Sequence, residues 1–252
     1  MEYAHLQLGQ DAKAKQVMEE MKATQLGTYP NVAVYTAMVA IPARYYLERQ
    51  DWKGASQLEP LGSGFPANEW QRAVADGITY FGIAMGFARS GDAASANSAV
   101  DKLKAQRETL LRLKQGYWAE QVEVQVLGAQ AWVEQTKGDK GEALKFMRAA
   151  ADLEDGSEKH VAMENRLYPM RELLADMLRE QGDAASALKE YEASMKNAPN
   201  RLRAYYGCGK AATALGQTKK ADACYRQLVR LARNSDSERP EIQEVAQLLA
   251  SK

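Results

Sequence analysis

A short turn pattern recurs six times along this chain of 252 residues. Each copy begins with Gly or Gln, continues with Asp or Gln, and has Ala five residues after its first position. Glycine takes the left-handed backbone that ends a helix, Asp caps the helix that follows, and Ala lets two helices approach closely. Each copy therefore predicts the turn inside a helix hairpin. The six copies are Gly9-Gln10 with Ala14, Gln50-Asp51 with Ala55, Gly91-Asp92 with Ala96, Gly138-Asp139 with Ala143, Gly182-Asp183 with Ala187, and Gly216-Gln217 with Ala221.

The composition favours helices on both sides of these turns. The chain has 42 Ala, the strongest helix former, but only 25 Val, Ile and Thr together, the β-branched residues typical of strands. Apolar residues also recur at helical spacing, as at Tyr80, Ile83, Ala84 and Phe87. We expect an all-α fold that forms a single domain over residues 1–252. Its predicted hairpins cover about 1–27, 30–60, 68–113, 117–153, 168–199 and 201–233, and a C-terminal capping helix covers 239–251.

The last two hairpins resemble the tetratricopeptide repeat, a helix pair that recurs every 34 residues. Their turn glycines, Gly182 and Gly216, are 34 residues apart. With the turn glycine at repeat position 15, small and large residues fall where the repeat has them. They are Leu174, Ala175, Leu178, Ala187, Tyr191 and Pro199 in the first hairpin, and Tyr205, Cys208, Gly209, Ala212, Ala221, Tyr225 and Leu228 in the second. The resemblance implies an α-solenoid of about six such hairpins.

Other segments resemble the C-terminal half of larger, uncharacterised bacterial tetratricopeptide proteins. They are IPARYYLERQDWKGASQLEP, YWAEQVEVQ, AAADLEDGSEKH and YEASMKNAPNRLRAYYG. This resemblance implies a bacterial source. Met1 falls at repeat position 7, inside a helix, so we expect either a misplaced start or a fragment of a longer chain. The chain as given is expected to stay in the cytoplasm, whereas a longer parent with an export signal would be exported.

The resemblance also implies a concave face lined by the first helices of successive hairpins, with repeat positions 2, 5, 9 and 12 pointing into it. Such a face binds a protein or peptide partner. The residues predicted to contact the partner are Arg44, Phe81, Met85, Trp132, Asp176, Arg203, Tyr206 and Lys210. Phe81, Met85 and Trp132 would form an apolar central patch with cations on both sides, and aromatic and Arg anchors commonly dominate binding energy.

The charge balance argues against nucleic acid as the partner. The chain has 33 Lys and Arg against 33 Asp and Glu, whereas phosphate recognition depends on a basic excess. The longest uncharged run, between Lys22 and Arg44, contains Asn, Gln, Thr and two Pro, and its continuous apolar part is too short to cross a bilayer. We therefore expect no membrane insertion.

Residues suited to catalysis are few. The spacing of the two cysteines, Cys208 and Cys224, matches no metal or redox motif, so we expect both to pack inside the repeat. His5 is expected to pack half-buried in the first helix. His160 lies with Glu164 and other carboxylates in the long connection from 153 to 169, and a metal or general-base site there is an alternative. The main expectation is a chain that is no enzyme and has no cofactor and no metal.

Three hypotheses of function follow from these patterns. The first is a non-catalytic scaffold that binds a protein or peptide in the concave face. The second is self-assembly or docking through the truncated N-terminal repeat, whose open apolar face would pair with a second copy or with a missing N-terminal half. The third is the metal or catalytic site on the 153–169 loop. Because each hairpin of an array contacts mainly its neighbours, the N-terminal unit is also expected to fray first.

Overall fold

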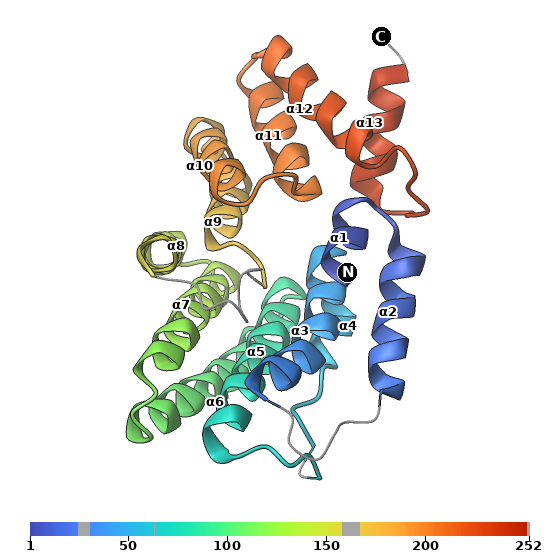
Figure 1. Cartoon of the computed structure of the whole chain (residues 1–252). Helices are drawn as coiled ribbons and strands as arrows, with labels where there is room; N and C mark the ends of the chain where they lie inside the picture. Colours follow the sequence, from blue (N-terminus) through green and yellow to red (C-terminus); the bar gives the residue numbers. More distant parts are fainter. Residues whose placement is uncertain (25–30, 63, 158–166, 251–252) are drawn as a thin grey trace. The chain divides into compact units, whose positions relative to one another are not determined.

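The computed structural model describes residues 1–24, 31–62, 64–157 and 167–250. These residues form thirteen α-helices and no strand, and the helices pack in adjacent pairs (Figure 1). The prediction of an all-α fold is therefore confirmed. The helices are α1 Glu2–Gln7, α2 Asp11–Ala23, α3 Val32–Glu48, α4 Trp52–Ser56, α5 Glu69–Arg89, α6 Ala93–Arg112, α7 Gly116–Lys137, α8 Lys140–Gly156, α9 Met170–Glu180, α10 Ala184–Asn197, α11 Leu202–Ala214, α12 Thr218–Leu231 and α13 Pro240–Ala250.

The repeated turn pattern has the geometry that its residues predict. Its five glycines all have a positive φ, between 65° and 93°. In four of the hairpins the Asp of the pattern accepts the backbone N–H of the residue three positions later, at 2.9–3.1 Å. This bond satisfies a donor that the first turn of a helix otherwise leaves without a partner. The capping residues are Asp51, Asp92, Asp139 and Asp183.

By their contacts the helices group into two compact units, each of which is described by itself. Unit 1 consists of Met1–Glu19 and Arg171–Lys252. Unit 2 consists of Glu20–Met170. Unit 1 thus joins two distant segments of the sequence, and unit 2 holds the continuous stretch between them.

Unit 2 is a stack in which each helix from α3 to α8 contacts the next one along the chain (Figure 1). The first helices of neighbouring hairpins also touch, α3 against α5 and α5 against α7. At the contact of α4 with α5, a Cβ added to Gly86 would lie only 2.4 Å from the backbone nitrogen of Ser56. The two helices therefore meet backbone to backbone, and a larger residue at position 86 would force them apart.

The connection between α4 and α5 is held on the surface of α5. Arg72 donates from its guanidinium to three backbone carbonyl oxygens of this segment, at 2.7–3.1 Å. The Asp76 carboxylate accepts the backbone N–H of Leu61 at 3.0 Å. Burial raises the pKa of Asp76, while the bond from Leu61 and the charge of Arg72 oppose that rise. These bonds hold Leu61, Gly62 and Phe65 against the first turns of α5.

In unit 1, α10 contacts α11, α11 contacts α12, and α13 contacts both α11 and α12. Tyr191 of α10 is fully buried, and its hydroxyl donates to the Asp176 carboxylate at 2.5 Å. Arg179 Nε donates to the same hydroxyl at 3.3 Å. Burial raises the pKa of Tyr191 well above its ordinary value, and the charge of Asp176 adds to the rise. The buried hydroxyl therefore stays neutral and serves as a hydrogen-bonding link between α9 and α10.

The N-terminal hairpin packs into unit 1. Its apolar residues Leu6, Ala14 and Met18 are only 0–3% exposed. The expectation of an open apolar face on this hairpin is therefore wrong, because the hairpin folds together with the C-terminal segment of the same chain.

The two cysteines are bonded to each other. Cys208 of α11 and Cys224 of α12 form a disulfide, with their Cα atoms 6.1 Å apart. Both residues are buried, as the sequence predicts for packing positions. The two cysteines are 16 residues apart in sequence and lie on the two helices of one hairpin. This spacing matches no known motif, so the sequence alone does not predict the bond.

A glycine should stabilise the turn between α6 and α7. Lys114 has a φ of 58° there, in the left-handed region that favours glycine. We expect Lys114→Gly to raise the free energy of unfolding by about 1 kcal/mol, because it relieves the strained backbone. As the opposite change, Gly138→Ala at a φ of 90° should lower that free energy by a similar amount. Urea unfolding followed by circular dichroism measures both, and a destabilised Lys114→Gly would contradict the turn geometry.

Reduction of the Cys208–Cys224 bond should lower the free energy of unfolding by about 3 kcal/mol, because the cross-link restricts the unfolded chain over a loop of 16 residues. Thermal unfolding with and without dithiothreitol measures the effect. The double variant Cys208→Ala, Cys224→Ala is the control, since its stability should not respond to the reductant. An equal response of wild type and variant would rule out the bond as the cause.

Candidate functional site

Six of the eight residues predicted to face a partner are buried instead, four of them in unit 2 and two in unit 1. Phe81, Met85 and Trp132 are 0–2% exposed, and Arg44 is 9% exposed. The prediction of an exposed apolar patch on the concave face is therefore wrong. The physical reason is that neighbouring first helices touch directly, so side chains at these repeat positions fill the space between them.

Trp132 of α7 illustrates this packing. The guanidinium carbon of Arg89, on α5, lies 4.1 Å from the centroid of its ring. One turn further along α7, Thr136 Oγ1 donates to the carbonyl oxygen of Ala88 at 2.9 Å. The indole is enclosed between α5 and α7, and its role is to hold the two helices together.

The other four predicted residues lie together in unit 1. Asp176 of α9 and Arg203 of α11 are buried, with an oxygen of the carboxylate 3.6 Å from a guanidinium nitrogen. Tyr206 and Lys210 continue along α11 and are partly exposed. The first helices α9 and α11 thus bring these side chains to one face of the unit.

The helix α13 neutralises the cations on this face. Arg203 Nη1 donates to Glu241 at 3.4 Å, and Glu244 accepts from Tyr206 Oη at 2.6 Å and from Lys210 Nζ at 2.8 Å. We call these five residues the α13 cluster. Hydrogen bonds from Lys210 and Tyr206 hold the pKa of Glu244 below its usual value, while burial and the bond to Glu244 raise the pKa of Tyr206. The cluster therefore satisfies its own charges and presents no unpaired cation to a partner.

The alternative site on the 153–169 connection cannot be placed, because His160 and Glu164 lie outside the described residues. Within the described ranges, no group of three or more His, Cys, Asp or Glu residues is arranged to hold a metal ion. His5 is half-buried, as predicted, and its Nδ1 lies 2.9 Å from Gln10 Oε1.

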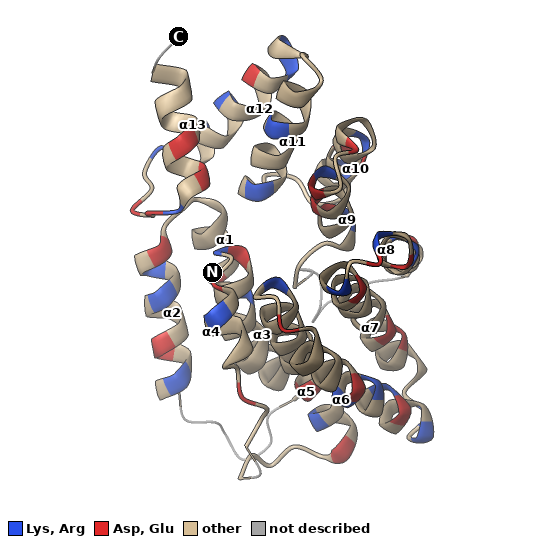
Figure 2. Ribbon diagram, turned by 180° about the vertical axis from the view of Figure 1, so that it is seen from behind, with Lys and Arg blue, Asp and Glu red and all other residues tan. Residues whose placement is uncertain are grey.

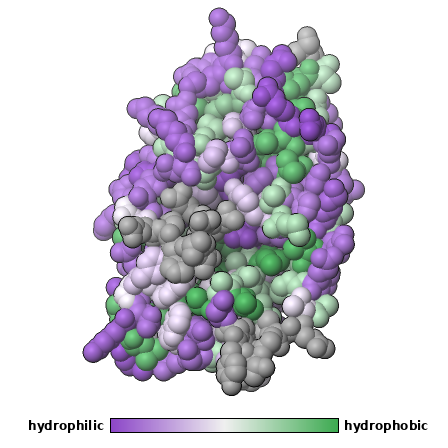
Figure 3. Space-filling model, in the orientation of Figure 1, coloured by the Kyte–Doolittle hydropathy of each residue, from purple (hydrophilic) through white to green (hydrophobic). Residues whose placement is uncertain are grey.

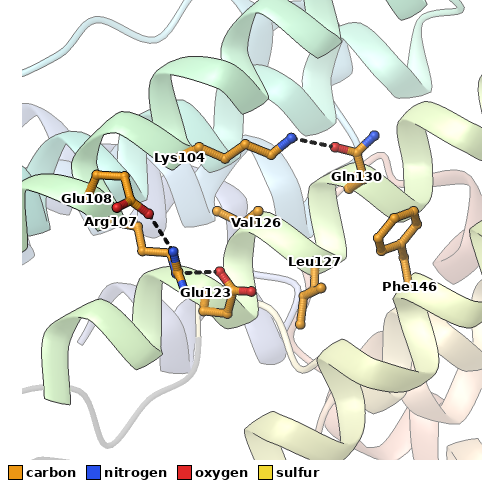
Figure 4. A pocket seen from close by; sticks show the side chains of 8 residues that line it. All are labelled: Lys104, Arg107, Glu108, Glu123, Val126, Leu127, Gln130 and Phe146. Carbon is orange, nitrogen blue, oxygen red and sulfur yellow. Dashed lines mark hydrogen bonds and ion pairs between the residues drawn. The ribbon is translucent and has the colours of Figure 1, made fainter. Parts of the chain in front are cut away.

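An open cavity of about 310 Å³ lies between α6, α7 and α8 of unit 2 (Figure 4). We call it the α6–α8 cavity. Sequence reasoning missed it because Val126, Leu127 and Gln130 on α7 occupy repeat positions 3, 4 and 7 rather than the positions of the concave face, and Glu123 precedes position 1. Its lining residues are Lys104, Arg107 and Glu108 of α6, Glu123, Val126, Leu127 and Gln130 of α7, and Phe146 of α8.

The centre of the α6–α8 cavity is apolar. Val126 is buried, and Leu127 and Phe146 are half-buried. Figure 4 shows the three side chains directed towards the space that the helices enclose. Because two of them still meet solvent, a partner that covers them removes apolar surface from water, a gain of about 25 cal/mol per Å².

Two polar pairs border this apolar centre. Arg107 Nε lies 2.7 Å from a carboxylate oxygen of Glu123, and Lys104 Nζ donates to Gln130 Oε1 at 3.1 Å. Arg107 also donates to Glu108 at 2.5 Å. Both signs of charge and one amide thus surround the apolar surface, an arrangement that orients a ligand while the centre supplies contact area.

A smaller cavity of about 220 Å³ lies between α5 and α6. Half-buried Tyr80, Ile83 and Phe87 line it from α5, and Lys102 Nζ lies 5.6 Å from the centroid of the Tyr80 ring. Burial raises the pKa of Tyr80, and the charge of Asp76 adds to the rise. Lys102 is the one charged residue in this lining, so the α6–α8 cavity offers more polar contacts and more volume.

The surface is otherwise mixed in character. Lys and Arg are interspersed with Asp and Glu on the helices in Figure 2, and hydrophilic side chains dominate the face drawn in Figure 3. Among the described residues the exposed large hydrophobic side chains are Met1, Leu8, Leu111 and Leu215. In the part of the chain that the structure describes, no helix has both the length and the apolar character needed to span a bilayer.

The last full hairpin matches a known family of repeats. The family model of the tetratricopeptide repeat matches residues 202–235, which contain α11 and α12. Residues 202–235 therefore match the tetratricopeptide repeat, as the sequence predicts for this hairpin. The expected bacterial origin of the chain stays a prediction.

Similarity to individual proteins is weak. No curated protein matches the chain in sequence. Among solved structures, the chain is similar to the "Crystal structure of APC/C hetero-tetramer Cut9-Hcn1", with 14% sequence identity and a TM-score of 0.42. That match covers 96% of this chain and 46% of the other, so this chain spans about half the length of the protein that it matches.

The α13 cluster should loosen in acid. The pKa of Glu244 lies below its ordinary value of 4.5, so its stabilising effect is complete above that pH and is lost as the pH falls through the lowered pKa. Hydrogen exchange of the α13 amides, corrected for intrinsic rates, should therefore accelerate below about pH 4.5. In Glu244→Gln the exchange should already be faster at pH 7 and should depend less on acid. Equal exchange of variant and wild type at pH 7 would contradict this role of Glu244.

Proposed function

We propose that this chain is a non-catalytic scaffold that binds a protein partner in the α6–α8 cavity. The observation that carries the proposal is the combination, in one open cavity, of an apolar centre with side chains of both charges at its edge. The tetratricopeptide repeat at 202–235 supports the scaffold class, since stacked helix pairs create extended surfaces for partners.

The size of the cavity supports a peptide segment as the part of the partner that binds. Its volume of about 310 Å³ is at the lower end of the range of ligand sites, roughly 300–1,000 Å³. That volume suits one or two inserted side chains. The half-buried Leu127 and Phe146 favour an apolar side chain as the anchor, because its insertion covers both of them.

The polar pairs support a fixed orientation of this peptide. Arg107 and Lys104 have acceptors within the chain, Glu123 and Gln130, so the free protein holds no isolated charge at this site. Carboxylate groups of a peptide can replace these acceptors, but exposed ion pairs contribute only about 0–1 kcal/mol each. The polar edge therefore selects the direction and sequence of the peptide, and the apolar centre supplies most of the affinity.

Alanine at Phe146 should weaken partner binding by about 30-fold, because removal of an anchoring aromatic side chain commonly costs about 2 kcal/mol. A photo-crosslinking amino acid in place of Leu127 would first trap the partner. A peptide from the cross-linked region of the partner would then be titrated against wild type and Phe146→Ala by calorimetry.

The matched control is Leu111→Ala. Leu111 is also an apolar residue of unit 2 and is 44% exposed, but it does not line the cavity, so its variant should bind as wild type does. Circular dichroism checks that Phe146→Ala keeps its fold. Equal affinity of wild type and Phe146→Ala would overturn the site, and so would a partner that cross-links from position 111 as efficiently as from position 127.

A further inference from the structure

Unit 1 is assembled from two segments that unit 2 separates in sequence. We call residues 1–19 the N-terminal hairpin; they contain α1 and the first turns of α2. Hydrogen bonds from this hairpin to the C-terminal segment span 195 to 233 residues of sequence. The C-terminal segment thus carries a binding site for a helix hairpin. We call this site the acceptor surface; it consists of Leu202 of α11 and residues 235–239, which precede α13.

A buried ion pair anchors the hairpin on the acceptor surface. Arg239 is 4% exposed and donates from Nε to Asp11 Oδ2 at 3.1 Å and from Nη2 to Asp11 Oδ1. Ser237 Oγ donates to the same carboxylate at 2.6 Å. Arg239 Nη2 also donates to the carbonyl oxygen of Leu6 at 3.2 Å, near the end of α1. A guanidinium that bonds both oxygens of one carboxylate fixes direction as well as distance.

The turn between α1 and α2 is recognised through its backbone. The carbonyl oxygen of Gly9 accepts from Ser235 Oγ at 2.8 Å and from the N–H of Asp236 at 3.1 Å. The N–H of Ala12 donates to Asp236 Oδ1 at 3.2 Å. A Cβ at Gly9 would lie 2.6 Å from Ser235 Oγ, so a glycine is required at this turn for the close contact as well as for its φ of 65°.

The hairpin also caps a helix of the C-terminal segment. Gln7 Oε1 accepts the backbone N–H of Leu202, the first residue of α11, at 3.0 Å. Arg201, the N-cap residue of α11, makes no capping bond with its own side chain. The docked hairpin thus satisfies a donor that the start of a helix otherwise leaves exposed.

Polar contacts determine where the hairpin docks, and apolar contacts add only modestly to the strength of docking. Gln7 Nε2 and Arg239 Nη1 are buried and have no hydrogen-bond partner among the described residues. Each unmet buried donor costs about 1–3 kcal/mol. The fully buried apolar side chains of the hairpin are Leu6, Ala14 and Met18. This combination of exact polar placement and modest apolar burial favours an association that can open and reform.

We propose that the acceptor surface binds the N-terminal hairpin of a second copy in exchange for its own, which gives a symmetric dimer. Each bond described above joins residues 6–12 to residues 202–239, and each forms equally well between two chains as within one. Within one chain the covalent connection keeps the hairpin near its own acceptor surface and so raises its effective concentration there. The hairpin of the same chain therefore occupies the surface in dilute solution, and exchange increases with protein concentration.

Two full-length variants with reversed charge test the exchange. Asp11→Arg places a cation opposite Arg239, and Arg239→Asp places a carboxylate opposite Asp11, so neither variant can dock its hairpin within its own chain or on an identical copy. When the two are mixed, the Arg at position 11 of one chain meets the Asp at position 239 of the other, and the reciprocal contact is the natural pair. Both contacts of an exchanged dimer are therefore restored only in the mixture.

Light scattering after size-exclusion chromatography measures the result. We expect each variant alone to have the mass of one chain and the equimolar mixture to show a species of twice that mass. The doubly substituted chain, Asp11→Arg with Arg239→Asp, is the control, because it restores the pair within one chain and should run as wild type does. A mixture that retains the mass of one chain would overturn the proposal.

If circular dichroism shows that a charge-reversed chain is unfolded, a second pair of variants tests whether the hairpin is exchanged between chains. Ala12→Cys in one chain and Asp236→Cys in another, both with Cys208 and Cys224 replaced by Ala, place single thiols on the two sides of the exchanged contact. Oxidation of the mixture should give a disulfide-linked dimer at least tenfold faster than a mixture of Leu111→Cys and Asp236→Cys. Equal rates would overturn the exchange.

Discussion

The turn between paired helices is the constraint on which the rest of this structure depends. A residue with left-handed backbone ends the first helix, and an Asp side chain bonds a free N–H at the start of the second, so both helix ends are satisfied within a few residues. A connection this short brings the two helices side by side. Each pair then has an apolar face that only another helix pair can cover, and stacking follows.

The sequence predicts the fold better than it predicts the binding residues, for a physical reason. Turn chemistry is local, so Gly138 and Asp139 determine the backbone whatever lies beyond them. Whether Phe81 or Trp132 is exposed depends on the helix that stands opposite, and helical spacing does not identify that helix. For the same reason the pattern indicates where the cations of α11 lie but not that Glu244 of α13 meets them.

The polar side chains of the two units have different surroundings. In the α13 cluster, carboxylates of the chain itself meet the Arg, Tyr and Lys side chains of α11, so that face is complete without a partner. In the α6–α8 cavity the polar pairs surround apolar side chains that remain partly open to solvent. One repeat architecture thus closes a helix face with its own terminal helix in unit 1 and leaves another face accessible in unit 2.

The bond from Gln7 to Leu202 also joins two residues that are made far apart in time. Gln7 leaves the ribosome 195 residues before the N–H that it accepts has been made. Unit 2 consists of neighbouring helices and has the local contacts that fold quickly and in order, whereas unit 1 needs helices that are made after unit 2. The N-terminal hairpin therefore stays without its acceptor surface while unit 2 is made, and on a polysome the first acceptor surface that it meets can belong to the chain ahead.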